Sequence, residues 1–257
     1  DSTANWHAEG DTLGGAYVQS ANGTVQVNQN RIHNQANELT EITNVPGTTL
    51  WNNVYESDDA GNMTKVDMPT TMNSSWTCSY DAWNRLVNVE IDPSQTVATY
   101  QYDGLFRRVQ RYSEQPSPVT RHLYYSDQWQ LLEDRQRGTL KKLWLWGIRY
   151  PDDLIYRERL NTPTDKHYAF QDYFNVVGVC HYHSASSTTV VDERFGYDAY
   201  GTSRVMTGSF GSTTDSLDWE FRFHAAHFDN ETGLYLMRHR YEHAKLGRWL
   251  SWDPLGY

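Results

Sequence analysis

The sequence predicts an all-β fold of stacked antiparallel β-hairpins, with little helix, and three observations support this prediction. Among 257 residues there are 18 Tyr, 10 Trp and 8 Phe, and aromatic side chains suit half-buried pleated surfaces. A short motif recurs at even spacing, and the residues around it alternate between polar and apolar as they do in a strand. No window repeats apolar residues with the period of a helix over three turns.

The recurring motif occurs five times in the first half of the chain, as HNQANEL, SDDAGNM, YDAWNRL, YDGLFRR and YSDQWQL. Its second residue is short and polar, and the spacing between copies is 22 to 24 positions; these residues are Asn34, Asp58, Asp81, Asp103 and Ser126. Such side chains accept hydrogen bonds from backbone N–H groups two residues on and thereby set turns. Each copy is therefore predicted to be a turn between two strands, stacked on the next copy to form a curved or spiralling sheet.

The residue three places further on decides how each turn is built. In the first three copies it is Asn37, Gly61 and Asn84, which are residue types that tolerate a positive φ in a tight hairpin. In the last two copies it is Phe106 and Trp129. These two turns are therefore expected to be built differently.

The even spacing predicts two regions. Residues 1–139 form a repeat ribbon, whereas over residues 140–257 the strict period fades although segments such as LKKLWLWGIRY and NVVGVCHYH still have strand patterns. The two cysteines, Cys78 and Cys180, are too few for a disulfide framework. Two unpaired buried thiols are favoured over a single bridge.

Charge and hydropathy exclude several classes of function. The net charge is −10, which makes binding to nucleic acid or to an anionic membrane improbable as the main task. No run of about 18 apolar residues exists, so no membrane span is predicted. The chain begins with Asp1 rather than Met, as expected of a processed product or a piece of a longer protein.

Three further segments, together with the repeats, resemble one known family. They are LWLWGIRYPDDLIYRER at 143–159, ERFGYDAYG at 193–201 and FDNETGLYLMRHRYEHAKLGRWLSWDPLG at 228–256. The chain resembles the Rhs, or YD-repeat, proteins and most of their C-terminal Rhs repeat-associated core. The resemblance implies a bacterial protein, secreted or displayed on the cell surface, whose hairpin ribbon winds into a shell that often encloses a toxic domain.

The family resemblance also implies an aspartyl-type self-cleavage in the core. Arg240 matches the core arginine and Asp253 the first of two aspartates, whereas the second aspartate and the cleaved bond would lie beyond Tyr257. Two carboxylates share acid and base roles that one carboxylate cannot fill alone. The expectation is therefore no catalytic residue in this chain, with Arg240 and Asp253 as family-matched remnants and with Arg240 at least partly buried against acceptor groups.

Several histidines raise the question of a metal site. The family pattern RYYDP is RYEHA here, which adds His243 near His239, and His181 and His183 share one face of a predicted strand. Imidazoles are common metal ligands, but they also fill polar β-surfaces, and the resemblance implies no metal. The prediction is therefore no metal and no cofactor, with these four histidines as weak candidates.

Two functions remain open, and a third is disfavoured. The first is a non-enzymatic wall segment of a larger Rhs shell, whose partner is the remainder of that chain. The second is a subunit of an extracellular filament or tube, because an open ribbon has unpaired edges that can pair with other copies of itself. In this respect residues 14–30 carry no Glu, Lys or Pro that would discourage pairing. The third is part of a self-cleaving toxin-encapsulating protein.

Overall fold

The computed structural model describes residues 13–21, 24–44, 55–69, 74–91, 95–160 and 165–254. These residues form antiparallel β-structure almost throughout, with one short 3₁₀ helix, η2 (Phe223–Ala225). The predicted all-β fold of stacked hairpins is thus confirmed. No helix among these residues is long and apolar enough to cross a membrane.

Two compact units are present, and each is described by itself. One comprises Asp1–Val97 and Leu250–Tyr257, and the other comprises Ala98–Trp249. The predicted division at 139/140 follows the sequence repeat rather than compactness, and it stays a prediction.

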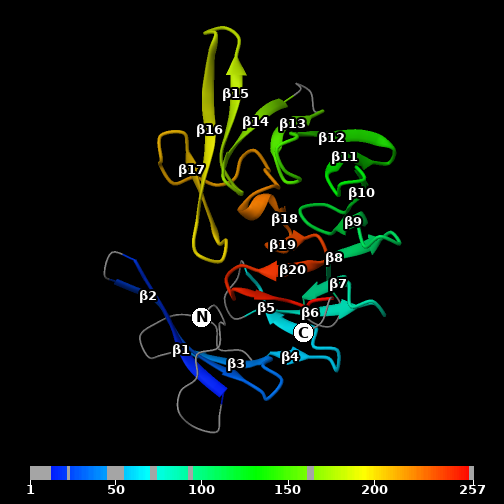
Figure 1. Ribbon diagram of the computed structural model, residues 1–257, viewed down its shortest axis with the longest axis vertical. Helices are drawn as coiled ribbons and strands as arrows, with labels where there is room; N and C mark the ends of the chain where they lie inside the picture. Colours follow the sequence, from blue (N-terminus) through cyan, green and yellow to red (C-terminus); the bar gives the residue numbers. More distant parts are fainter. Residues whose placement is uncertain are drawn as a thin grey trace. The chain divides into compact units, whose positions relative to one another are not determined.

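The first unit contains a three-stranded sheet and the first strands of a long meander (Figure 1). Its strands are β1 (Leu13–Ala21), β2 (Thr24–His33), β3 (Leu39–Asn44), β4 (Glu56–Ser57), β5 (Met63–Asp67), β6 (Ser75–Tyr80) and β7 (Leu86–Ile91). Strands β3, β5, β6 and β7 each bury apolar residues, including Ile42, Val66, Trp76 and Val89. In β6, Trp76 and Cys78 show the two-residue period expected of a strand with one face in a core, whereas in β7 the buried Leu86 and Val89 lie three positions apart.

The long meander runs from β4 to β17, and each of its 14 strands lies beside its neighbour in sequence. The later strands are β8 (Gln95–Tyr102), β9 (Arg108–Ser113), β10 (Val119–Tyr125), β11 (Leu131–Gln136), β12 (Thr139–Trp146), β13 (Leu154–Arg159), β14 (Asp165–Asp172), β15 (Asn175–His183), β16 (Thr188–Tyr197) and β17 (Ser203–Thr207). A small sheet follows, made of β18 (His227–Asp229), β19 (Leu234–Met237), β20 (Arg240–His243) and β21 (Arg248–Trp249).

The repeat turns share one hydrogen-bond pattern. In the third copy the carboxylate of Asp81 accepts from the backbone N–H groups of Trp83 (3.0 Å) and Arg85 (3.1 Å). The backbone N–H of Asn84 donates to the carbonyl of Asp81 at 3.0 Å, and Asn84 has φ 59°. Asp58, Asp103 and Ser126 accept from the equivalent backbone groups. The side chain of Asn34 accepts from the N–H four residues on.

The expectation that the fourth and fifth turns are built differently is wrong. Phe106 (φ 67°) and Trp129 (φ 66°) adopt the same left-handed conformation as Asn37 (φ 66°) and Gly61 (φ 78°). Both aromatic rings pack on His239, with ring centroids 5.7 and 4.7 Å from the imidazole. Tertiary packing therefore offsets a backbone conformation that is unfavourable for a bulky residue.

The turn pattern also extends beyond the region where the sequence period fades. The carboxylate of Asp198 accepts from the N–H groups of Tyr200 and Thr202, each at 2.9 Å, and Gly201 has φ 89°. The segment YDAYG is thus a further turn of the same kind. It lies well beyond the fifth copy at Ser126, so the even spacing of the first five copies does not predict it.

Candidate functional site

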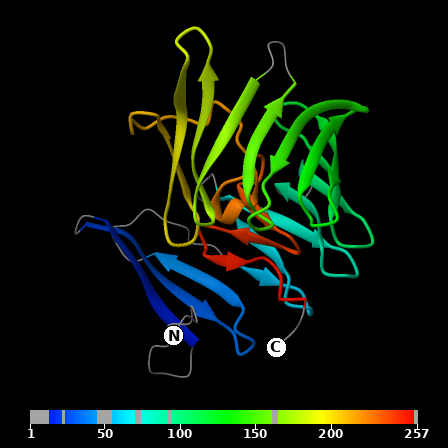
Figure 2. The ribbon, with the colours of Figure 1, turned by 45° about the horizontal axis from the view of Figure 1, so that its top comes forward.

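Residues 215–231, here called the inner segment, lie within the curve of strands β9–β16 (Figure 2). Trp219 and Phe221 of this segment belong to the main apolar cluster, where they are buried with side chains from six strands. Those partners are Leu123, Leu131, Trp144, Leu154, Val176, Val179 and Phe195. The inner segment therefore supplies part of the core that the sheet alone could not complete.

Asp229 is the centre of a buried polar network at the end of β18. The guanidinium of Arg108, on β9, donates to both of its carboxylate oxygens, with one N···O distance of 2.9 Å. Arg111 donates to the same carboxylate at 3.1 Å, and His227 Nδ1 lies 3.2 Å from it. Arg108 also donates to the Tyr241 hydroxyl at 2.9 Å. One buried carboxylate thus ties the inner segment to strand β9 and to β20.

The protonation of this network follows from its charges. Burial alone would raise the pKa of Asp229, but Arg108, the contact with His227 and Arg111 outweigh it and hold that pKa well below its ordinary value. The pKa of His227 is lowered, because its burial and the positive charge of Arg108 outweigh the attraction of Asp229. Asp229 is therefore a fixed anion and His227 a neutral imidazole at pH 7.

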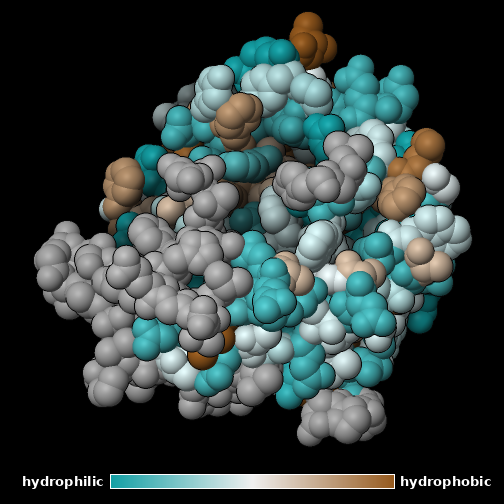
Figure 3. Space-filling view, turned by 60° about the horizontal axis from the view of Figure 1, so that its bottom comes forward, coloured by the Kyte–Doolittle hydropathy of each residue, from teal (hydrophilic) through white to brown (hydrophobic). Residues whose placement is uncertain are grey.

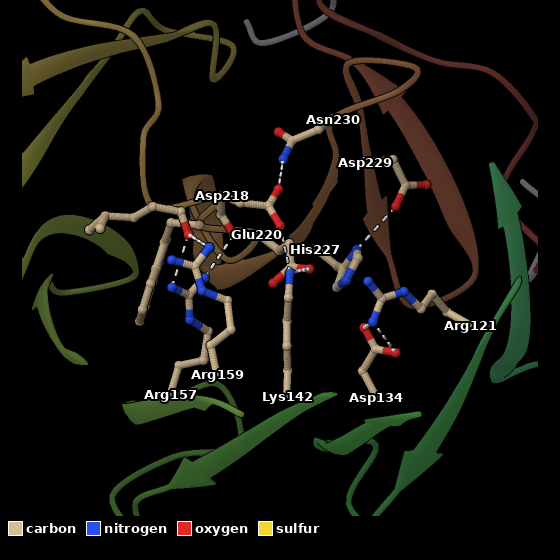
Figure 4. Close-up of polar contacts among 12 residues, drawn as sticks. Arg121, Asp134, Lys142, Arg157, Arg159, Asp218, Glu220, His227, Asp229 and Asn230 are labelled. Atoms are coloured by element: carbon tan, nitrogen blue, oxygen red, sulfur yellow. Dashed lines mark hydrogen bonds and ion pairs between the residues drawn. The ribbon is translucent and has the colours of Figure 1, made fainter. Parts of the chain in front are cut away.

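A second buried group of charges holds the other end of the inner segment (Figure 4). The Lys142 ammonium, on β12, donates to the carboxylate of Glu220 and, at 2.7 Å, to that of Asp218. Arg157, on β13, donates to the carbonyls of Asp218 (2.7 Å) and Leu217 (2.9 Å). Burial would raise the pKa of Glu220, but Lys142 outweighs it and the pKa is lowered. The positive charges of Lys142 and Arg157 on the strands are thus compensated by carboxylate and carbonyl groups of the inner segment.

This arrangement suits structural support. A general acid or base works best when its pKa lies near the operating pH, whereas Asp229 and Glu220 are held ionised by buried cations. Removal of one partner from such a pair leaves the other charge buried without compensation, which is strongly destabilising.

A cavity of about 340 Å³ lies beside the Asp229 network. Its lining includes Arg108, His227, Phe221, Trp146 and Arg240. The arginine side chains in this lining favour a carboxylate, and their guanidinium planes can also stack on an aromatic group.

Arg240, the family-matched arginine, is partly buried on β20, and its guanidinium lies over the Trp249 ring at 4.2 Å from the centroid. Asp253, the family-matched aspartate, is partly buried and belongs to the other compact unit. The roles implied for these two residues stay predictions.

The four candidate histidines do not form one group. His243 is fully buried, and its Nδ1 accepts from the backbone N–H of Leu246 at 3.1 Å. His239 packs against the rings of Phe106 and Trp129 in the fourth and fifth repeat turns. His183 is exposed, with Nδ1 2.8 Å from the hydroxyl of Ser186.

His181 instead meets two residues that the sequence did not single out, His167 and Asp192, and the metal-binding atoms of these three side chains lie within 4.8 Å of one another. They come from three neighbouring strands, so no local pattern in the sequence joins them. The two cysteines, in contrast, are unpaired and buried, as predicted.

Comparison with known proteins identifies the repeat. Residues 80–115, which hold the third and fourth copies of the turn motif, match the RHS Repeat family model. The chain therefore contains an RHS repeat, which confirms the repeat part of the predicted resemblance. No curated protein matches the sequence.

Solved toxin structures show similarity at low identity. The Photorhabdus luminescens Tc holotoxin pore, with a mutation in TccC3, is 13% identical over 96% of this chain, with a TM-score of 0.43. A crystal structure of TcdB2-TccC3 is 13% identical over 97% of this chain, with a TM-score of 0.31. The chain spans only 17% and 21% of those two chains.

Proposed function

We propose that this chain is a non-enzymatic wall segment of a larger bacterial Rhs protein, secreted or held at the cell surface. The RHS repeat at residues 80–115 supports the class of protein. The single observation that carries the structural role is the inner segment, which is held against the curved sheet by compensated buried charges such as Arg108–Asp229 and Lys142–Glu220.

In this proposal the sheet is the wall and the inner segment is a brace that fixes its curvature. The polar contacts of the inner segment with β9, β12 and β13 join residues 58 to 121 positions apart in sequence. Such contacts form only when the wall has folded into its final curve. The enclosed guest of such a shell would be a toxic domain, as the family resemblance implies.

The mass of the native polypeptide that contains these residues tests the wall role. Antibodies raised against the folded chain should detect, in the medium or on the surface of the producing bacterium, a much larger polypeptide that contains these residues. A native product of about 29.9 kDa that occurs alone would contradict the wall role.

A filament or tube subunit is the second candidate, and one observation favours it. β1 (Leu13–Ala21) pairs with β2 alone within the described part of its sheet, which leaves its other edge available to a second copy. Light scattering and electron microscopy of the full chain, with and without residues 1–28, test this candidate. Polymers that vanish on truncation would support it, and a monomer at high concentration would contradict it.

The coloured side chains on the face shown in Figure 3 are mainly hydrophilic, and the apolar ones stand apart from one another. The coloured part of this face therefore offers little apolar surface for association.

Self-cleavage is the third candidate and the least supported. In our proposal Arg240 and Asp253 act in structure and not in catalysis. Incubation of the purified chain between pH 4 and pH 9 is expected to release no fragment. Cleavage that disappears in Asp253→Asn would contradict the non-enzymatic assignment.

A further inference from the structure

We propose that His167, His181 and Asp192 form a site for one divalent transition-metal ion of the Zn²⁺ class. The three side chains come from the adjacent strands β14, β15 and β16. Nothing in the wall or brace role requires such a site.

The spacing of the donor atoms fits a metal ion. His167 Nε2 lies 3.5 Å from Asp192 Oδ2, and His181 Nδ1 lies 2.7 Å from the same oxygen. Ligand atoms on a tetrahedral zinc ion at about 2.0–2.1 Å are about 3.3 Å apart. All three donor atoms lie within 4.8 Å of one another, so small side-chain movements would bring them to coordinating distance.

A β-bulge aims Asp192 at the histidines. Val179 pairs with Glu193 and Cys180 pairs with Val191, so Asp192 is the extra residue between two paired positions. Bulges of this kind re-aim a side chain and are common beside functional sites.

His167 is held by a second carboxylate, as metal-binding histidines usually are. Its Nδ1 contacts the carboxylate of Asp165, which leaves Nε2 facing Asp192. Asp165 is itself paired with Arg159. Asp192 contributes the negative charge, and its ion pairs among the described residues are with these two histidines.

The site has an open side. His167 is buried, whereas the side chains of His181 and Asp192 are 34% and 21% exposed. Three protein ligands with one position left for water is the arrangement of an accessible zinc site. Bound metal would link three strands of the wall and could take an exogenous ligand in the fourth position.

Metal titration of the full chain tests the proposal. After dialysis against EDTA, calorimetry with Zn²⁺ alone should show one site, and Co²⁺ should produce the visible absorption of a four-coordinate complex. His181→Ala and Asp192→Asn should each weaken Zn²⁺ binding by about 10-fold or more, with an unchanged melting temperature in EDTA.

Two exposed histidines of the same compact unit provide controls. His122→Ala, on β10, and His183→Ala, two residues from His181, should change the affinity by less than about 3-fold. Equal binding by the wild type and His181→Ala would overturn the assignment, as would a loss of affinity in His183→Ala as large as that in His181→Ala.

Nuclear magnetic resonance of the wild type keeps the proposal testable if a variant fails to fold. Addition of Zn²⁺ should shift the imidazole signals of His167 and His181 and leave that of His122 in place. Shifts confined to other histidines, or no binding of Zn²⁺ or Co²⁺, would contradict the proposal.

Discussion

The repeat turns at Asp103 and Ser126 and the inner segment belong to the same compact unit and stabilise it by different means. In a turn, the hydrogen bonds of the leading residue span two to four positions, as when Asp103 accepts from the N–H groups of Leu105 and Arg107. In the inner segment, Asp229 meets Arg108 across 121 positions. Local turns can form early and independently, whereas the buried charges are satisfied only when the sheet has already curved around them. The repeats thus define the strands, and the inner segment fixes how they curve.

The largest effect is expected from breaking the inner-segment network. Asp229→Asn leaves Arg108 buried without its anion, and we expect the free energy of unfolding to fall by about 3–5 kcal/mol. Chemical denaturation monitored by tryptophan fluorescence measures it. The matched control is Asp152→Asn, whose partner Arg238 lies 3.3 Å away at a half-exposed position. This control should change stability by less than about 1 kcal/mol, and equal effects would erase the contrast between buried and exposed pairs.

The next effect depends on pH and involves Glu242, on β20. Burial, with the charge of Asp198, raises its pKa to about 7, against an ordinary 4.5. The folded state therefore keeps a proton that the unfolded chain releases, and this group makes the free energy of unfolding fall as pH rises from about 4.5 to about 7.

Glu242→Gln should consequently stabilise the fold at pH 8 by about 1–3 kcal/mol and have little effect at pH 4. Denaturation of both proteins at the two pH values tests this expectation. Asp127→Asn, at an exposed turn position, is the control. A Glu242→Gln effect independent of pH would contradict the prediction.

A smaller effect is expected at Arg240. Its guanidinium packs over Trp249. Arg240→Ala removes this partly buried cation–π contact and should lower the free energy of unfolding by about 1–2 kcal/mol. Arg240→Lys keeps the charge but loses the planar group, so it should recover only part of the stability. A melting temperature of Arg240→Lys equal to that of the wild type would contradict this prediction, because it would show that the positive charge alone stabilises the fold.

The smallest effect concerns one repeat turn. Asp103→Ala removes the acceptor for the N–H groups of Leu105 and Arg107, and we expect a loss of about 1 kcal/mol. Asp127→Ala, in the next turn where Ser126 fills that role, should be neutral. If Asp103→Ala lowered the free energy of unfolding as much as Asp229→Asn does, a single repeat turn and the Asp229 network would contribute equally to stability, against this prediction.

The contrast also explains what the sequence could predict. The turns at Asp58, Asp81 and Asp103 were predictable because side chain and backbone act within four residues. The left-handed backbone conformation of Phe106 and Trp129 within the fourth and fifth turns was not predictable, since a remote histidine packs on both rings.

The polar sites were less predictable than the turns. Arg108 and Asp229 lie on strands of two different sheets, and a bulge places Asp192 beside His167; alternation alone reveals neither arrangement. His181 was identified as a weak candidate, but its partners were not.

A double-mutant cycle on Arg108 and Asp229 tests most directly whether compensated buried charge holds the inner segment to the wall. Arg108→Met and Asp229→Leu should each lower the free energy of unfolding by about 3–5 kcal/mol. The double variant should be more stable than the sum of those losses predicts, by about 2 kcal/mol or more. Strictly additive losses would contradict the account, because they would show that the two charges do not stabilise each other in the folded protein.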